Sequence, residues 1–143
     1  MKSVRDIMTT DVDVCTTEDN IYEAAVIMKN RDVGAVPICD REAHLIGMVT
    51  DRDLVIRGYA DKKSGSTSIQ EVMSDQLYSV SPDTTTQEAT EIMAEKKIRR
   101  LPVVDNGKLV GIVSLGDLSL DEQSDEAAGE ALEEISETRP GMH

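Results

Sequence analysis

The chain has 143 residues and a formal net charge of −13, of which residues 121–143 supply −7. Such an acidic chain is a poor candidate for nonspecific binding to nucleic acid or to an anionic membrane, because both depend on Lys and Arg. No apolar run approaches the roughly 18 residues that span a bilayer, and the N-terminal residues lack an apolar signal core, so we expect a cytoplasmic protein. With three Tyr, no Phe and no Trp, its core must be aliphatic.

The chain repeats itself. Residues 4–54 align with 69–118 at an offset of 65 residues, which becomes 64 after a one-residue gap. Twelve aligned positions are identical and occur in the same order, so chance is a poor explanation. One unit of about fifty residues buries too little apolar surface to be stable alone. We therefore expect the two repeats to share a core.

In each repeat we predict a strand, a helix, a hairpin and a short second helix. The first strand of repeat one is expected at Val12–Cys15. The helix after it begins at the capping box Asn20-x-x-Glu23, in which each side chain can satisfy an orphan backbone N–H group. Its apolar positions recur at helical spacing and lie on one face: Ile21, Ala24, Ala25 and Met28.

The hairpin of repeat one joins Ala35–Cys39 to Leu45–Thr50, and the second helix follows Thr50. In repeat two, Asn106-Gly107 is a strong turn signal because both residue types tolerate a positive φ. The corresponding elements of repeat two are expected at Leu77–Val80, from the capping box Thr85-x-x-Glu88 onward, at Leu101–Val104, at Leu109–Ser114 and after Ser114.

The pattern predicts an α/β (α+β) fold. Two βαββα units would pack sheet against sheet as a pseudo-twofold sandwich with flanking helices, since this arrangement buries the inner faces of both. Residues 58–68 are polar and predict a linker. Residues 121–143 form an acidic tail whose weak apolar stripe is compatible with a docked helix or with a solvated one.

Three segments carry a resemblance to a known family. Each repeat opens with a V-x-D-I-M-like segment, at Val4–Met8 and Ile69–Met73, and later has an apolar-Pro-apolar-apolar-Asp stretch. Each ends in the signature G-h-h-[ST]-x-x-D-h, at Gly47–Leu54 and Gly111–Leu118. The repeats resemble CBS motifs, named after cystathionine β-synthase, and the pair resembles a stand-alone Bateman module of the bacterial and archaeal type. The resemblance implies motif one at 1–57 and motif two at 69–120.

The resemblance implies a regulatory module. In this family two motifs form a disc-like pair with two clefts, which often bind adenosine-containing ligands such as AMP, ADP, ATP or S-adenosylmethionine. Pairs usually form dimers, and many regulate an attached or partner protein. We therefore expect an adenine nucleotide, AMP first, in the cleft between the motifs, a homodimer, and a regulated protein that the sequence does not name.

The signature itself makes chemical sense. Thr50 and Ser114 follow a strand and can cap the next helix, and Asp53 and Asp117 come three residues later in its first turn. A carboxylate can accept hydrogen bonds from the two hydroxyl groups of a ribose. Two interpretations stay open: the Asp residues hold a ribose, as the resemblance implies, or they only stabilise helix starts.

The repeats differ just before the proline of the apolar-Pro-apolar-apolar-Asp stretch that each repeat contains. Repeat two has Arg99 and Arg100 three and two residues before Pro102, and repeat one has Gly34 and Ala35 at the same positions before Pro37. In nucleotide-binding family members, basic residues at these positions reach phosphate, and a guanidinium suits phosphate geometry. The alternative is that the arginines pair with surface acids. The candidate ligand-binding residues are Arg99, Arg100, Leu101, Ser114, Asp117, Thr50, Arg52, Asp53 and Ala35.

No catalytic residue and no metal ligand set is predicted. His44 falls in a hairpin and His143 at the terminus, with no nucleophile–base arrangement, and no P-loop or zinc spacing occurs. Cys15 and Cys39 are interpreted as buried free thiols. No cofactor is expected to be required.

Three hypotheses of different classes remain. The first is a nucleotide-binding sensor, in which repeat two binds more strongly than repeat one. The second is a CBS scaffold for protein–protein interaction with empty clefts, or a module that binds S-adenosylmethionine or NADH. The third and weakest is an enzyme. Arg99, Arg100 and Asp117 together favour the first.

Overall fold

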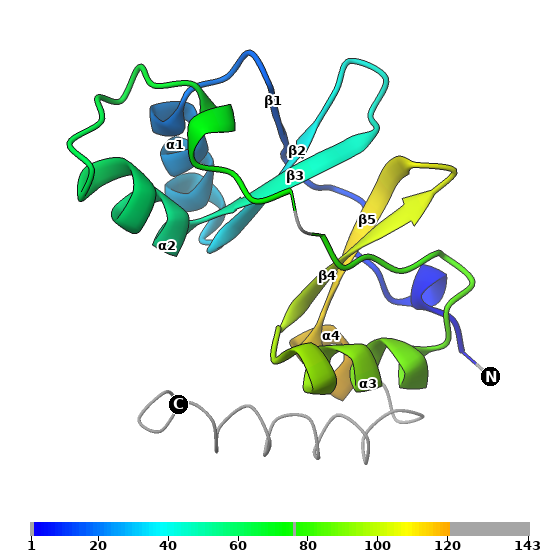
Figure 1. Cartoon of the computed structure of the whole chain (residues 1–143). Coiled ribbons are helices and arrows are strands. Elements are labelled where there is room, and N and C mark those ends of the chain that lie inside the picture. Colours follow the sequence, from blue (N-terminus) through cyan, green and yellow to red (C-terminus); the bar gives the residue numbers. More distant parts are fainter. Residues whose placement is uncertain (1, 76, 121–143) are drawn as a thin grey trace. The chain divides into compact units, whose positions relative to one another are not determined.

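The computed structural model describes residues 2–75 and 77–120, and the predicted acidic tail lies outside them. The chain forms two compact units, shown in Figure 1. The repeat-one unit consists of residues 13–75, 77 and 107–109, and the repeat-two unit consists of residues 2–12, 78–106 and 110–120. Each unit combines helices with strands, which confirms the α/β class.

The repeat-one unit has a three-stranded sheet in the order β1-β2-β3. Strand β1 (Cys15–Thr16) runs parallel to β2 (Ala35–Cys39), which pairs antiparallel with β3 (Leu45–Thr50). The helical elements of this unit are α1 (Ile21–Arg31), α2 (Asp51–Asp53), the π-helix η2 (Leu54–Tyr59) and the 3-10 helix η3 (Ile69–Glu71).

The repeat-two unit is built on the same plan. Strands β4 (Arg100–Asp105) and β5 (Lys108–Ser114) form a two-stranded sheet. The helical elements are η1 (Val4–Asp6), α3 (Thr86–Lys96) and α4 (Leu115–Ser119). At the hairpin turn, Asn106 has φ 52° and Gly107 has φ 83°, which confirms the prediction of a turn with positive φ.

Local capping signals set the helix starts. The Asn20 side chain accepts a hydrogen bond from the Glu23 N–H group at 2.9 Å, and Thr85 accepts one from Glu88 at 3.1 Å. Of the four residues on the predicted apolar face of α1, Ile21, Ala24 and Met28 are buried. Ala25 is exposed. The buried face of α1 is therefore narrower than the spacing of its apolar residues indicated.

The predicted first strand of each repeat is misplaced. In repeat one, pairing with β2 begins only at Cys15, opposite Ile38, so the expected strand at Val12–Cys15 becomes Cys15–Thr16. In repeat two, the expected strand at 77–80 reduces to one parallel bridge between Val80 and Val103. Pro82, which has no N–H group to donate, follows closely and helps to limit the pairing.

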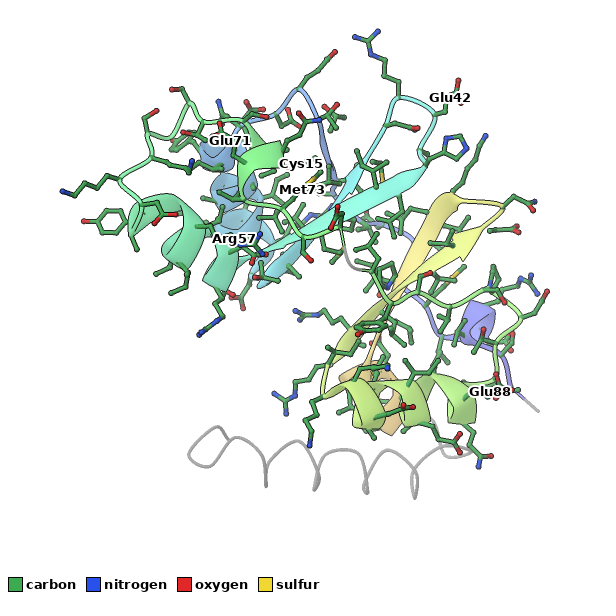
Figure 2. All side chains as sticks on the ribbon, viewed as in Figure 1. Cys15, Glu42, Arg57, Glu71, Met73 and Glu88 are labelled. Carbon is green, nitrogen blue, oxygen red and sulfur yellow. The ribbon has the colours of Figure 1, made fainter. Side chains whose placement is uncertain are left out.

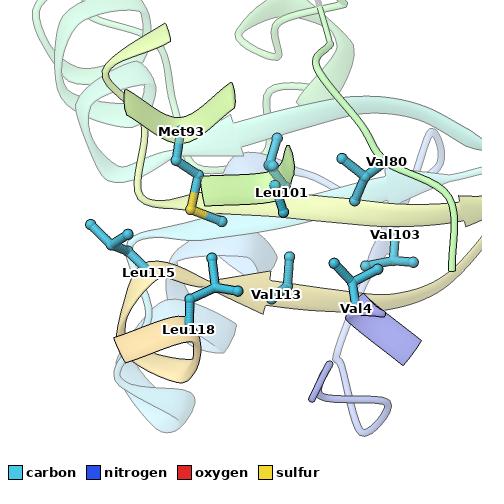
Figure 3. Close-up of a cluster of buried hydrophobic side chains, with 9 residues drawn as sticks. Val4, Val80, Met93, Leu101, Val103, Val113, Leu115 and Leu118 are labelled. Atoms are coloured by element: carbon cyan, nitrogen blue, oxygen red, sulfur yellow. The ribbon is translucent and has the colours of Figure 1, made fainter. Parts of the chain in front are cut away.

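The opening segments of the two repeats are exchanged. Val4, from the start of repeat one, packs in the core of the repeat-two unit, shown in Figure 3. Ile69 and Val72, from the start of repeat two, pack in the core of the repeat-one unit. Backbone hydrogen bonds fix the exchange, because Thr9 and Ile112 bond reciprocally at 2.8 and 2.9 Å.

The exchange explains the glycine of each signature. A Cβ atom at Gly111 would lie 2.8 Å from the Met8 sulfur and 2.9 Å from the Thr9 carbonyl oxygen. A Cβ atom at Gly47 would lie 2.8 Å from the Met73 sulfur. Each glycine therefore gives the exchanged segment room to cross the strand, since real Cβ contacts do not come this close.

Cys15 and Cys39 are free and buried, which confirms their interpretation. Burial raises the pKa of the Cys15 thiol to about 11, with a further contribution from the charges of Asp19 and Glu23. Burial likewise raises the pKa of the Cys39 thiol to about 11, aided by Asp40. Both thiols are thus protonated and shielded at neutral pH.

Candidate functional site

In repeat two, Ser114 and Asp117 form a complete capping box at the start of α4. The Ser114 N–H group donates to Asp117 Oδ2 at 3.1 Å, and the Asp117 N–H group donates to Ser114 Oγ at 3.0 Å. The helix-stabilising interpretation of these residues is therefore part of their role. The capping box does not use every polar group of these residues. The Ser114 O–H group remains available as a donor to a ligand.

The second carboxylate oxygen of Asp117 makes no polar contact with the described residues. Among residues 2–75 and 77–120, no hydrogen bond or ion pair engages Asp117 Oδ1. The side chain is half-buried and borders an open hollow of about 260 Å³, whose other walls are Lys2, Ile7 and Leu120. The opening segment of repeat one thus supplies part of the wall beside the repeat-two signature.

Arg99 and Arg100 lie at the start of β4 and are both exposed. The Arg99 carbonyl oxygen accepts a hydrogen bond from the Leu115 N–H group at 2.8 Å, which ties this end of β4 to the start of α4. Within the part of the chain that the structure describes, neither guanidinium makes an ion pair. The alternative of arginines neutralised by surface acids therefore has no support among these residues.

Leu101, the second residue of β4, is fully buried in the repeat-two core. Its side chain packs with Met93, Val113 and Leu118 (Figure 3). A ligand would therefore meet its backbone rather than its side chain.

In repeat one, Thr50 and Asp53 form the equivalent capping box, at 2.9 and 3.1 Å. Here the second oxygen is engaged. Arg57 donates to Asp53 Oδ1 at 3.1 Å and to the Met73 carbonyl oxygen at 3.3 Å. The Asp53 side chain is only 16% exposed. The two signature aspartates occupy equivalent positions in the sequence, but their Oδ1 atoms differ. That of Asp53 accepts a hydrogen bond from Arg57, and that of Asp117 accepts none from a described residue.

The rest of the repeat-one site is acidic. The Asp51 N–H group donates to the Gly34 carbonyl oxygen at 2.9 Å, matching the bond of Leu115 in repeat two. A Cβ atom at Gly34 would lie 3.3 Å from Asp51 Oδ2. A carboxylate therefore sits at the position that aligns with Arg99. Ala35 is half-buried at the start of β2, and Arg52 is exposed.

Sequence reasoning missed Arg57, Lys2 and Ile7. Arg57 was detectable, because it lies four residues after Asp53 on a predicted helix, the spacing of a helical ion pair. Lys2 and Ile7 had no local signal, since only the exchange of segments places them beside Asp117.

No metal centre is apparent in residues 2–75 and 77–120, where no three His, Cys, Asp or Glu side chains gather into a possible cation site. His44 lies in the β2–β3 turn with its Nδ1 atom 3.0 Å from Asp40 Oδ2. The described helices include none that is both long and apolar enough to cross a bilayer.

Comparison with known proteins identifies the repeats. The profile of the CBS domain family matches residues 4–58 and 69–120. The chain is 51% identical over 138 residues to the uncharacterized protein YlbB of Bacillus subtilis, covering 96% of this chain and 93% of that protein.

Two similar solved structures hold adenosine compounds. The structure of CBSX2 in complex with AMP is 27% identical, with a TM-score of 0.76, and the alignment covers 88% of this chain and 99% of that one. The CBS domain pair of MJ0100, solved with 5-methylthioadenosine and S-adenosyl-L-methionine, is also 27% identical, with a TM-score of 0.74, covering 84% and 94%.

Proposed function

Because the chain belongs to the CBS domain family and carries two CBS motifs, which are regulatory modules, we propose that it is a non-catalytic sensor of an adenine nucleotide. AMP is the preferred ligand, bound at the repeat-two site. The response is passed to a partner protein. The AMP complex of CBSX2 and the adenosyl ligands of MJ0100 support this class of ligand.

One observation carries the proposal. Arg99 and Arg100 are adjacent, exposed and without an ion-pair partner in the described chain, although the protein has a net charge of −13. A backbone hydrogen bond from Leu115 to Arg99 ties these arginines to the helix start that carries Asp117. In so acidic a protein, arginines without an ion pair at the same end of the unit as a carboxylate oxygen without a donor suit a ligand that has both a phosphate and a ribose. The guanidinium groups would hold the phosphate, and Asp117 with Ser114 would hold the ribose.

The test is a calorimetric titration of the protein with AMP, ATP, S-adenosylmethionine and NADH. We expect about one AMP per chain, with weaker binding of S-adenosylmethionine, which has no phosphate to meet the arginines. Tighter binding of S-adenosylmethionine than AMP would contradict the assigned role of the arginines. No binding of any of the four would favour a protein-interaction scaffold instead.

The homodimer is a further part of the proposal. On η2, Val55, Ile56 and Tyr59 are 55%, 49% and 84% exposed and form an apolar face of the repeat-one unit. Twofold association of two such faces would remove them from water. Light scattering at micromolar concentration should give about twice 15.6 kDa. A mass near 15.6 kDa would contradict the dimer.

A further inference from the structure

Arg57 makes the two CBS motifs unequal. It lies on η2, and Figure 2 shows it in the same unit as Met73, from the exchanged segment of repeat two. Its two terminal nitrogens reach different partners: one donates to Asp53 Oδ1 at 3.1 Å and the other to the Met73 carbonyl oxygen at 3.3 Å. The Arg57 guanidinium therefore joins Asp53 to the exchanged segment of repeat two.

This contact uses the oxygen that a ribose would need. Thr50 N–H bonds to Asp53 Oδ2 at 2.9 Å, so with Arg57 on Oδ1 both oxygens have a donor within the protein. The remaining lone pairs are hard to reach, because the Asp53 side chain is 16% exposed. A ribose would have to displace a charge-assisted hydrogen bond, the stronger kind of hydrogen bond in proteins.

The described part of repeat two has no counterpart of this contact. Asp117 accepts the capping bond from Ser114 at 3.1 Å, and no other described residue bonds to it. In the sequence, the position that aligns with Arg57 is Asp121, a residue type without an N–H donor in its side chain. The two motifs therefore differ in residue type at the position that holds Arg57 in repeat one.

We propose that Arg57 is a specificity-determining residue that limits each chain to one bound nucleotide. It holds the Asp53 carboxylate in an internal ion pair, so that repeat one does not accept a ribose while repeat two does. The inference deepens the proposed function and rests on it for the role of the signature aspartates. It gives a structural cause for the single site per chain that the proposed function expects.

The residues around Asp53 also determine which class of ligand repeat one could bind if Arg57 were removed. Asp51 lies against Gly34, and the positions of the phosphate-binding arginines are Gly34 and Ala35. A phosphate there would meet the Asp51 carboxylate, with no arginine at the two positions that hold Arg99 and Arg100 in repeat two. Removal of Arg57 should therefore create a site that prefers adenosine, which is uncharged, to AMP.

The experiment compares calorimetric titrations of adenosine and AMP into wild type, Arg57→Ala and Lys29→Ala. Lys29 is the matched control, because it is an exposed basic residue of the repeat-one unit, on α1, without an ion pair in the described residues. We expect Arg57→Ala to bind about one more adenosine per chain than wild type. Lys29→Ala should behave as wild type, and Asp53→Ala added to Arg57→Ala should remove the gained site.

Each outcome separates the inference from the proposed function. If wild type binds AMP and Arg57→Ala gains no adenosine site, the role of Arg57 is wrong and the sensor proposal stands. If wild type binds neither compound and Arg57→Ala binds adenosine, the role of Arg57 stands and the AMP sensor is wrong. If no variant binds either compound, both are overturned.

A second variant guards against a folding defect. Arg57→Gln keeps an N–H donor near the Met73 carbonyl oxygen but removes the positive charge that holds Asp53. If Arg57→Ala does not fold, a gained adenosine site in Arg57→Gln supports the inference, and its absence in a folded Arg57→Gln overturns it.

Discussion

Replacing Asp117 with alanine is expected to weaken AMP binding by roughly 10- to 150-fold, the cost of losing about 1.5–3 kcal/mol from hydrogen bonds to a charged group. The physical reason is that the Asp117 carboxylate would accept the hydrogen bonds of the ribose in the proposed contact. Its Oδ1 atom has no bond from another described residue, and its side chain borders the hollow next to Ile7. The measurement is the dissociation constant for AMP by calorimetry.

Loss of the α4 capping box is the obvious confounding effect of this variant. Asp53→Ala is the matched control, because it removes the same kind of capping box from the other motif, at 2.9 and 3.1 Å. Both variants should lose a similar amount of stability, about 0.5–2 kcal/mol each, and only Asp117→Ala should lose AMP affinity. Equal loss of affinity in the two would contradict the site assignment.

Arg100→Ala should act on the same site through the phosphate, lowering AMP affinity by a comparable factor and adenosine affinity hardly at all. Lys29→Ala removes an equal charge from an exposed position in the other motif. If Lys29→Ala weakened AMP binding as much as Arg100→Ala, the effect would be one of net charge and not of a phosphate contact.

The second large effect concerns the exchanged segments. Ile69→Ala should lower the free energy of unfolding by about 2–5 kcal/mol, because it removes a fully buried side chain from the repeat-one core and leaves a cavity. The residue belongs to repeat two by sequence, so the effect on repeat one tests the exchange directly. Urea denaturation measures the loss.

The buried thiols report which unit is weakened. Cys15 lies in the same cluster as Ile69, and burial keeps its thiol unreactive in the folded protein. A loss of about 2 kcal/mol or more raises the open population by roughly 30-fold, and thiol labelling at pH 8 should accelerate accordingly. Gln70→Ala, at the exposed neighbouring position, should change neither stability nor labelling. Similar results for the two variants would contradict the exchange.

The sequence predicted most of the local structure, because the relevant signals lie within a few residues of each other. The start of α1 follows from Asn20, the turn from Asn106-Gly107, and the signature capping boxes from residues three apart. The first strands were misplaced because their extent depends on a partner strand. Pairing with Ile38 and Cys39, not the apolar alternation at Val12–Cys15, decides where β1 begins.

The residues of the candidate sites also fall into two groups, those with a local sequence signal and those without one. Ser114 and Asp117 are close in sequence, and the bond between Leu115 and Arg99 brings the arginines to the same end of the unit. The wall formed by Lys2 and Ile7 has no local signal, because more than a hundred residues separate it from Asp117. A repeat alignment compares equivalent positions, so it cannot show that opening segments trade places.

The traded segments also impose an order on folding during synthesis. The ribosome makes the chain from its N-terminus, and domains generally fold as they emerge. Val4 is made more than a hundred residues before Leu118, one of its partners in the core. Ile69 and Val72, by contrast, emerge soon after the elements they stabilise. The segment around Val4 can therefore reach its native place only long after its own synthesis.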